Sequence, residues 1–256
     1  MVAVLPAYAG AGMTVADGEG LRQALEEAER IFSLPGLEVE GIYTHFARAD
    51  DPDPSPSRTQ LERFNALLSG LRQRGISVPL RHAANSAAVF SLPESHLDLV
   101  RPGLMLYGLC PLSGADRDEL GLRPALALKA RIAQIKQVAP GMGISYGSTH
   151  VTKRSTRIAT LPMGYADGYN RLLSGQGEVL FRGSRASVVG RICMDQTMVD
   201  VGDLPPLEAG EEAVALGRQD GEEISAEELA RICGTINYEI VTSIPPRVPR
   251  IYFHPG

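Results

Sequence analysis

Hydrophobic residues recur every three to four positions in two stretches of the first half of the chain, and this spacing predicts two helices. Positions three and four apart share one face of a helix, so each apolar face is expected to be buried. The first helix begins at about residue 19, and its apolar positions are Leu21, Ala24, Leu25, Ala28 and Ile31. The second begins at about residue 57 and stops near Gly75, with apolar positions Leu61, Phe64, Leu67, Leu68 and Leu71.

Runs rich in β-forming residues lie between and after these helices, at 36–46, 80–86 and 97–108. Alternating strands and helices imply a parallel sheet with right-handed crossovers. A complete (β/α)₈ barrel takes about 250 residues. The alternating part ends near residue 108 and shows three clear strands, so within a barrel it would be the closing half. The expected fold class is an α/β partial (β/α)₈ barrel followed by a mainly β C-terminal domain.

The pattern changes from about residue 123 onward. The segments 125–138, 157–165, 177–201 and 212–218 are strand-like and separated by glycine and proline turns. One helix is predicted among them, with a capping box of Ser225 and Glu228, apolar Leu229 and Ile232, and a stop at Gly234. The turn-forming segment 111–118 is the expected hinge. We therefore place the two domains at 1–115 and 120–256.

Composition narrows the class of protein. The chain has 256 residues, 44% hydrophobic and 21% charged, which is close to the globular average, and its net charge of -5 argues against nucleic acid. No apolar stretch approaches the roughly 20 residues of a membrane span, and the apolar N-terminus lacks the basic residues of a signal peptide. A cytoplasmic protein is expected. Cys110, Cys193 and Cys233 are widely spaced and the histidines show no metal-binding pattern, so we expect reduced thiols and no metal.

Polar residues with possible chemical roles stand at the ends of the predicted strands. His45, Ser86 and Arg101 occupy such positions, and Gly103 follows the last of them. Functional groups of parallel α/β folds gather at the C-terminal strand ends, and a hydroxyl with free backbone N–H groups forms an anion site. Taken singly, a satisfied core histidine at position 45 and an ordinary helix N-cap at position 86 are the simpler interpretations.

Tyr146 lies between Gly143 and Gly147, so a turn that presents its ring is expected. A tyrosine side chain acts as a general base only where a nearby cation or strong donor lowers its pKa from about 10. From composition alone, a ring packed in the turn is the simpler interpretation. Cys193 is interpreted as a buried small hydrophobic residue, not as a nucleophile.

Eight motifs carry a resemblance to a known family. THFARAD, HAANSAA, VRPGLMLYG, ISYGSTH, PMGYADGY, GRICMDQTMVDV, TINYE and RVPRIY occur in the order and spacing of alanine racemases, from about residue 36 to the C-terminus. The resemblance implies an isomerase that interconverts L-alanine and D-alanine for peptidoglycan with pyridoxal 5'-phosphate. It also implies an N-terminal barrel followed by a β-rich domain, and a head-to-tail homodimer with each active site between the barrel of one subunit and the β domain of the other.

The same resemblance assigns roles to residues. The family positions that hold the cofactor phosphate correspond here to Ser86, the backbone of Gly103 and Leu104, and Tyr238. Arg101 matches the arginine that faces the pyridine nitrogen, with His45 and His82 behind it. Because an arginine does not readily give up its proton, the ring nitrogen stays largely unprotonated, which suppresses side reactions such as transamination.

The substrate side of the site is matched by residues of the β-rich domain. Tyr146 corresponds to the tyrosine base, which reaches in from the partner subunit. Met194 and Asp195 correspond to residues beside the substrate carboxylate. Tyr165 and Arg171 correspond to the entrance of the site and the network near it.

The chain departs from the family pattern in its lysines and its N-terminus. The lysine that bonds the cofactor lies in a VKANAYGHG-like motif, whereas the only lysines here are Lys129, Lys136 and Lys153. Placing Gly12-Met13 on a GM pair of the family puts Tyr8 at a lysine position and Val15 at an arginine position.

These departures favour an N-terminally truncated or frame-disrupted alanine racemase of doubtful activity. The alternative is a diverged, non-catalytic homologue that acts as a cofactor-binding or dimerisation module. A broad-specificity amino-acid racemase is a third reading. Half a barrel would also expose strand edges, so poor solubility is expected unless the chain dimerises tightly.

Overall fold

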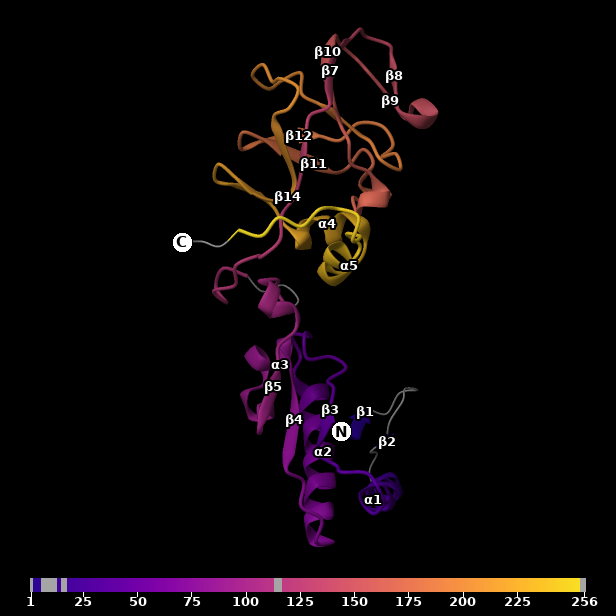
Figure 1. Cartoon of the computed structure of the whole chain (residues 1–256), viewed down its shortest axis with the longest axis vertical. Coiled ribbons are helices and arrows are strands. Elements are labelled where there is room, and N and C mark those ends of the chain that lie inside the picture. Colours follow the sequence, from indigo (N-terminus) through magenta and orange to yellow (C-terminus); the bar gives the residue numbers. More distant parts are fainter. Residues whose placement is uncertain (1, 6–12, 15–17, 113–116, 254–256) are drawn as a thin grey trace. The chain divides into compact units, whose positions relative to one another are not determined.

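The computed structural model describes residues 2–5, 13–14, 18–112 and 117–253, with the backbone alone for the first two ranges. The chain divides into two compact units, Met1–Arg123 (unit 1) and Pro124–Gly256 (unit 2). Figure 1 shows helices together with a sheet in unit 1, and mostly strands in unit 2. The expected partial barrel followed by a β domain is confirmed. Residues 113–116 of the predicted hinge lie outside the described residues, and so do Tyr8, Gly12 and Val15.

Unit 1 is built on a parallel sheet of order β2-β1-β3-β4-β5. Its strands are β1 (Val2–Leu5), β2 (Met13–Thr14), β3 (Gly41–Thr44), β4 (Leu80–Asn85) and β5 (Leu99–Arg101). Its helices are α1 (Glu19–Phe32), α2 (Ser55–Gln73), α3 (Ser86–Ser91) and the short 3₁₀ turns η1 (Pro93–Ser95) and η2 (Leu104–Tyr107). The predicted strands at 36–46 and 97–108 were too long, and β1 and β2 add to the three strands that were predicted.

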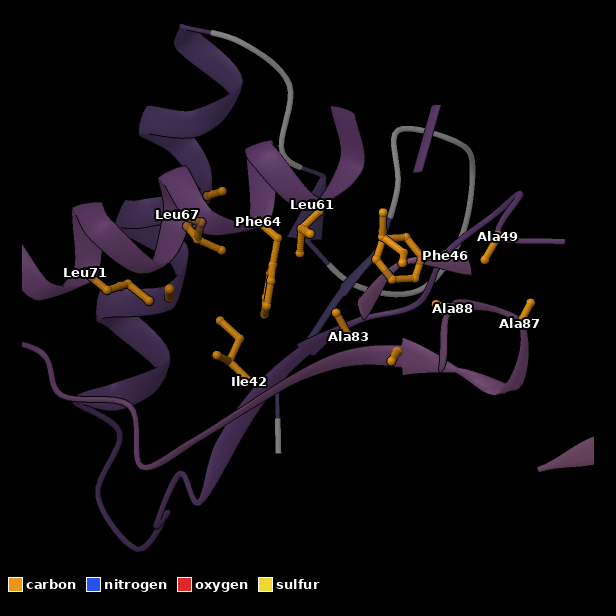
Figure 2. Close-up of a cluster of buried hydrophobic side chains, with 14 of the residues drawn as sticks. Ile42, Phe46, Ala49, Leu61, Phe64, Leu67, Leu71, Ala83, Ala87 and Ala88 are labelled. Carbon is orange, nitrogen blue, oxygen red and sulfur yellow. The ribbon is translucent and has the colours of Figure 1, made fainter. Parts of the chain in front are cut away.

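The core of unit 1 lies between α2 and the sheet. Figure 2 shows Leu61, Phe64, Leu67 and Leu71 along one face of α2, above Ile42 of β3. All five side chains are at least 95% buried, and full burial of such a side chain contributes about 1.5–3 kcal/mol. The periodicity that predicted α2 is therefore the periodicity of this contact.

The end of α2 also follows the predicted signal. Gly75 has φ +78°, and the Ile76 N–H donates to the Leu71 carbonyl at 3.0 Å, which closes a Schellman motif. Farther back in α2, a Cβ on Gly70 would lie 2.7 Å from a methyl group of Leu25. The glycine thus lets α1 and α2 approach closely.

The described part of unit 2, residues 124–253, contains three sheets of antiparallel strands. One has the order β13-β10-β7, the second β12-β11-β14-β15 with β6 beside β14, and the third is β8-β9. Their strands are β6 (Leu128–Arg131), β7 (Gln134–Val138), β8 (Gly143–Ile144), β9 (His150–Val151), β10 (Thr156–Leu161), β11 (Glu178–Phe181), β12 (Ser184–Ser187), β13 (Thr197–Asp200), β14 (Glu212–Gln219) and β15 (Glu222–Ile224). Three 3₁₀ turns, η3 (Tyr146–Ser148), η4 (Tyr165–Asp167) and η5 (Arg171–Leu173), connect them.

Two helices follow these strands, although only one was predicted. In α4 (Ala226–Cys233) the Ser225 hydroxyl accepts the Glu228 N–H at 3.0 Å, while the Glu228 carboxylate binds Arg185 at 2.7 Å. The second helix, α5 (Asn237–Thr242), has only six residues, too few to show a helical period. In the part of the chain that the structure describes, no helix has the length and apolar character needed to cross a bilayer.

Candidate active site

Arg101 is the centre of a polar cluster in unit 1, at the C-terminal end of β5. Its Nη1 donates to His82 Nδ1 at 2.5 Å, and its Nη2 donates to the Thr44 carbonyl at 2.8 Å and the Ala83 carbonyl at 3.2 Å. His45 Nδ1 is 3.4 Å from Nη2. These partners lie on or directly after β3 and β4, so three adjacent parallel strands together fix the guanidinium.

Aromatic rings support the same cluster. The Arg101 guanidinium lies 4.9 Å from the ring centroid of Tyr43, and Tyr43 stacks on His82 with centroids 5.1 Å apart. Tyr43 and His82 are paired in the register of β3 and β4, so their side chains point to the same face of the sheet. Carbonyl oxygens therefore accept hydrogen bonds from the guanidinium, and the Tyr43 ring packs against it.

Both histidines of the cluster favour their neutral form. Burial, and then the positive charge of Arg101, lower the pKa of His82 below the ordinary value of 6.5. The pKa of the more exposed His45 is lowered in the same direction by partial loss of contact with water and then by Arg101. Burial also lowers the pKa of Arg101. Since His82 Nδ1 accepts from Arg101, the ring proton must be on Nε2. That buried nitrogen has no hydrogen-bond partner among the described residues.

Ser86 and Gly103 form a small cradle beside the Arg101 cluster. The Gly103 N–H donates to the Ser86 hydroxyl at 2.8 Å, and Ser86 is 4% exposed. The N-cap of α3 is Asn85, whose side chain accepts the Ala88 N–H at 3.0 Å. The interpretation of Ser86 as an N-cap was therefore wrong. Its hydroxyl instead accepts the N–H of Gly103, which follows the end of β5.

A second set of polar side chains lines a cleft of about 400 Å³ in unit 2. Its walls are formed by Tyr146, Tyr165, Arg171, Arg191, Ile192, Cys193, Met194 and Asp195. Tyr146 and Met194 are the most exposed of the apolar and aromatic members, at 71% and 59%. The cleft thus combines an open tyrosine, two arginines and one carboxylate.

The backbone around Tyr146 explains how its ring is presented. Ser145, Gly147 and Ser148 have φ values of +63°, +71° and +45°, so Tyr146 stands in a sharp turn of left-handed residues. The Ser145 hydroxyl donates to the Arg191 carbonyl at 2.5 Å. A Cβ on Gly147 would lie 3.4 Å from the Arg191 guanidinium carbon. Arg191 therefore packs against the turn from both its backbone and its side chain.

The part of the cleft formed by Tyr165 and the Cys193–Met194 segment depends on close backbone contact. Gly164 approaches Cys193 so closely that a Cβ would lie 2.2 Å from the Cys193 carbonyl oxygen. The Tyr165 and Ala166 N–H groups donate to the carbonyls of Cys193 and Met194 at 3.0 and 2.9 Å. Two backbone hydrogen bonds thus join the loop that carries Tyr165 to the segment that carries Met194.

The structure brings the sequence-derived residues together in two groups, one in each unit. Ser86, Gly103, Leu104, Arg101, His45 and His82 belong to unit 1, whereas Tyr146, Tyr165, Arg171, Met194, Asp195 and Tyr238 belong to unit 2. Tyr238 is on α5, outside the residues that line the cleft. Lys129, Lys136 and Lys153 are also in unit 2, and Lys129 forms an exposed ion pair with Glu212.

Besides the N-cap interpretation of Ser86, three interpretations from sequence were wrong and one residue was missed. The Tyr146 ring is 71% exposed, so it is not packed in its turn. His45 is exposed, so it is not a core histidine, and Cys193 is only partly buried, in the cleft wall. Arg191 was not singled out as a cleft residue, although Gly190 beside it has φ +71° and marks a close approach. Among the described residues, no three histidine, cysteine, aspartate or glutamate side chains are grouped as a metal site would require.

Comparison with known proteins gives a consistent picture. Residues 14–111 match the family profile of the alanine racemase N-terminal domain, and residues 125–252 match that of its C-terminal domain. The alanine racemase of Carboxydothermus hydrogenoformans is 55% identical over 230 residues, covering 90% of this chain and 62% of that protein. The alanine racemase of Desulfosudis oleivorans is 50% identical, with 90% and 59% covered.

Solved structures agree with these matches. The crystal structure of alanine racemase from the D-cycloserine producer Streptomyces lavendulae superposes with a TM-score of 0.90 at 40% identity, covering 100% of this chain and 66% of that one. The Clostridium difficile alanine racemase in complex with cycloserine gives 0.82 at 39% identity, covering 88% and 59%. The chain thus spans about three fifths of the length of the curated relatives that it matches.

Proposed function

Because this chain belongs to the alanine racemase family, we propose that it provides cofactor and substrate residues for the interconversion of L-alanine and D-alanine. The observation that carries the proposal is the guanidinium of Arg101, bound between His82 and the ends of β3 and β4 beside the Ser86–Gly103 cradle. We place this reaction in the cytoplasm, where it would supply D-alanine for peptidoglycan.

The residues of unit 1 fit the phosphate and ring nitrogen of pyridoxal phosphate. The Ser86 hydroxyl, with the backbone N–H groups of Gly103 and Leu104, would hold the phosphate, and the family resemblance assigns Tyr238 to the same group. Arg101 would face the ring nitrogen. When bound, the cofactor supplies an electron-withdrawing ring that eases loss of the substrate Cα proton. None of the three lysines is in unit 1, so covalent attachment of the cofactor is assigned to no residue of this chain.

The charge of Arg101 has a chemical consequence for the bound ring. An arginine remains protonated at neutral pH, so it offers a hydrogen bond to the ring nitrogen without transferring its proton. Neutral His82 accepts from the same guanidinium and keeps it oriented. With the cofactor bound, a charged Arg101 held in this way would leave the ring nitrogen unprotonated, which would suppress side reactions that need a protonated ring.

The cleft of unit 2 would serve the substrate. The Tyr146 hydroxyl would exchange a proton at one face of Cα, and its exposure leaves it free to reach a bound molecule. The Met194–Asp195 segment would position the substrate carboxylate, and Tyr165 and Arg171 would line the entrance. We propose a head-to-tail homodimer in which unit 2 of one copy completes the site on unit 1 of the other.

Titration with pyridoxamine phosphate tests the phosphate site without any need for a lysine, because this analogue carries an amine in place of the aldehyde. Ser86→Ala should weaken its binding at least about tenfold, since it removes a buried hydroxyl from the cradle. Ser91→Ala, which removes a hydroxyl of the same helix that donates to the Ala49 carbonyl at 3.0 Å, should leave the affinity unchanged. Equal affinities for all three proteins would contradict the assigned cradle.

A second candidate function is cofactor binding without catalysis, and the absence of lysine from unit 1 favours it. Purified chain with pyridoxal phosphate and L-alanine, followed by chiral chromatography, separates the two candidates. Formation of D-alanine supports the racemase. Tight binding of the cofactor without D-alanine supports the binding module, and failure to bind the cofactor contradicts both.

A further inference from the structure

The loop 164–168, which carries Tyr165 into the cleft, is also bound from its other side by the C-terminal segment 243–250. The Arg247 guanidinium pairs with Asp167 at 2.8 Å, and its Nε donates to the Ala166 carbonyl at 3.1 Å. Two different groups of the loop are thus held by one side chain. Neither Arg247 nor Asp167 lines the cleft itself.

Asp167 transmits this contact to the start of the loop. One of its carboxylate oxygens pairs with Arg247, and the other accepts the Gly164 N–H at 3.0 Å. The Asp167 side chain is only 16% exposed, so its charge is partly removed from water and depends on the arginine for compensation. Gly164 in turn touches the Cys193 carbonyl, and the next two N–H groups bind Cys193 and Met194.

The segment that presents Arg247 is itself internally braced. Arg250 donates to the carbonyls of Ile244 at 2.9 Å and Val248 at 2.7 Å, which folds the segment back on itself. At its beginning the segment also supports Gly168, where a Cβ would lie 2.7 Å from Ile244 Cα. The contacts therefore run from a folded C-terminal segment, through the loop, to the wall of the cleft.

We propose that Arg247, acting through Asp167, is a positioning residue that fixes Tyr165 and the Cys193–Asp195 main chain in the substrate cleft. The role assigned to the cleft rests on the proposed function, but the positioning itself concerns the free protein. Its test therefore uses the full chain without cofactor or substrate, so that loss of racemase activity and loss of positioning are separate results.

Hydrogen exchange measured by mass spectrometry gives the first test. In Arg247→Met, exchange in peptides covering 164–168 and 193–196 should become at least about tenfold faster, because the N–H groups of Tyr165 and Ala166 lose their fixed acceptors. The matched control is Arg154→Met. Arg154 is similarly exposed and also paired with an aspartate, Asp203, but that aspartate is 81% exposed. The control should change neither peptide.

Alkylation of Cys193 gives a second, independent test, because this partly exposed thiol is in the cleft wall. Its labelling by iodoacetamide, measured against Cys233 in the same molecule, should accelerate several-fold in Arg247→Met. Asp167→Asn should have the same effect, and the double variant should be no worse than either single one if the two residues act as one unit. Arg247→Lys keeps the charge and can still pair with Asp167, although not with the Ala166 carbonyl at the same time, so it should retain more protection than Arg247→Met but less than the unmodified protein.

Two results would overturn the proposal. The first is exchange at 164–168 and 193–196 within twofold of the unmodified protein in both Arg247→Met and Asp167→Asn. The second is faster exchange spread evenly over unit 2, without rescue by Arg247→Lys, which would make the pair a general stabilising contact.

Discussion

Replacing Gly190 with alanine tests whether the turn that carries Tyr146 depends on its close contact with the backbone at Gly190. Gly190 has φ +71°, and an alanine Cβ there would lie 2.6 Å from the Ile144 carbonyl oxygen and 2.9 Å from Ser145 Cβ. Those residues directly precede Tyr146. The substitution therefore has two costs, one from the left-handed backbone and one from the contact with the turn.

The two costs can be separated in magnitude. A left-handed conformation costs an alanine about 1–2 kcal/mol. The Ile144 oxygen must also move by about 0.8 Å to restore an ordinary contact of 3.4 Å, and overpacking against a fixed neighbour costs about 1–3 kcal/mol. We expect Gly190→Ala to lower the free energy of unfolding of unit 2 by about 2–5 kcal/mol.

Gly175→Ala is the matched control for the first cost alone. Gly175 has φ +69°, and nothing lies within 4 Å of its added Cβ. Urea titration followed by hydrogen exchange should show a loss of about 1–2 kcal/mol for Gly175→Ala, with unchanged exchange at 144–148. Gly190→Ala should lose more and exchange faster at 144–148. Equal losses in the two variants would refute the argued contact.

Three further predictions concern the two units separately. Phe64→Ala empties the centre of the unit 1 core and should lower its free energy of unfolding by about 3–5 kcal/mol, with unit 2 unchanged in urea-dependent hydrogen exchange. Because the folded-state pKa of His82 is lowered, the stability that it contributes is present above about pH 6.5 and is lost as the pH falls below it. The loss is at most about 1.4 kcal/mol per pH unit, so urea titrations between pH 7.5 and 5.5 should show a decline that is smaller in His82→Asn, and no decline would contradict the neutral imidazole. Ser225→Ala removes the N-cap of α4 and should cost about 1 kcal/mol by the same urea assay, whereas a cost near zero would show that the Glu228–Arg185 contact holds the helix start without it.

The helices of unit 1 were predictable because their apolar faces are repeated over several turns. Leu61 to Leu71 mark four successive contacts of α2 with the core, so chance periodicity is a poor explanation. Strand lengths were not predictable in the same way. The segment 36–46 is rich in β-forming residues, yet the strand is Gly41–Thr44, because its ladder with β4 begins only where Gly41 faces Leu80. A strand ends where its partner ends, and the partner is distant in sequence.

In the candidate site, too, some residues could be inferred from the sequence and others could not. The positions of His45, Ser86 and Arg101 at strand ends were correctly inferred from the order of helices and strands, and their proximity follows from the parallel pairing. The part played by Arg191 was not inferred, because its contact with the Tyr146 turn is 44 residues distant along the chain and depends on backbone approach at Gly147. A contact such as that of Arg191, which only the folded chain creates, produces no recognisable pattern in the nearby sequence.

At the turn around Tyr146, the residues that direct this side chain differ from those that stabilise the protein. Its direction is decided by left-handed residues on both sides, while the ring itself is 71% exposed and contributes little to any core. The tyrosine can therefore be exchanged for another side chain while the backbone that aims it persists. Such a position can be varied in search of new chemistry at small cost to folding, because the scaffold and the reactive group are specified by different residues.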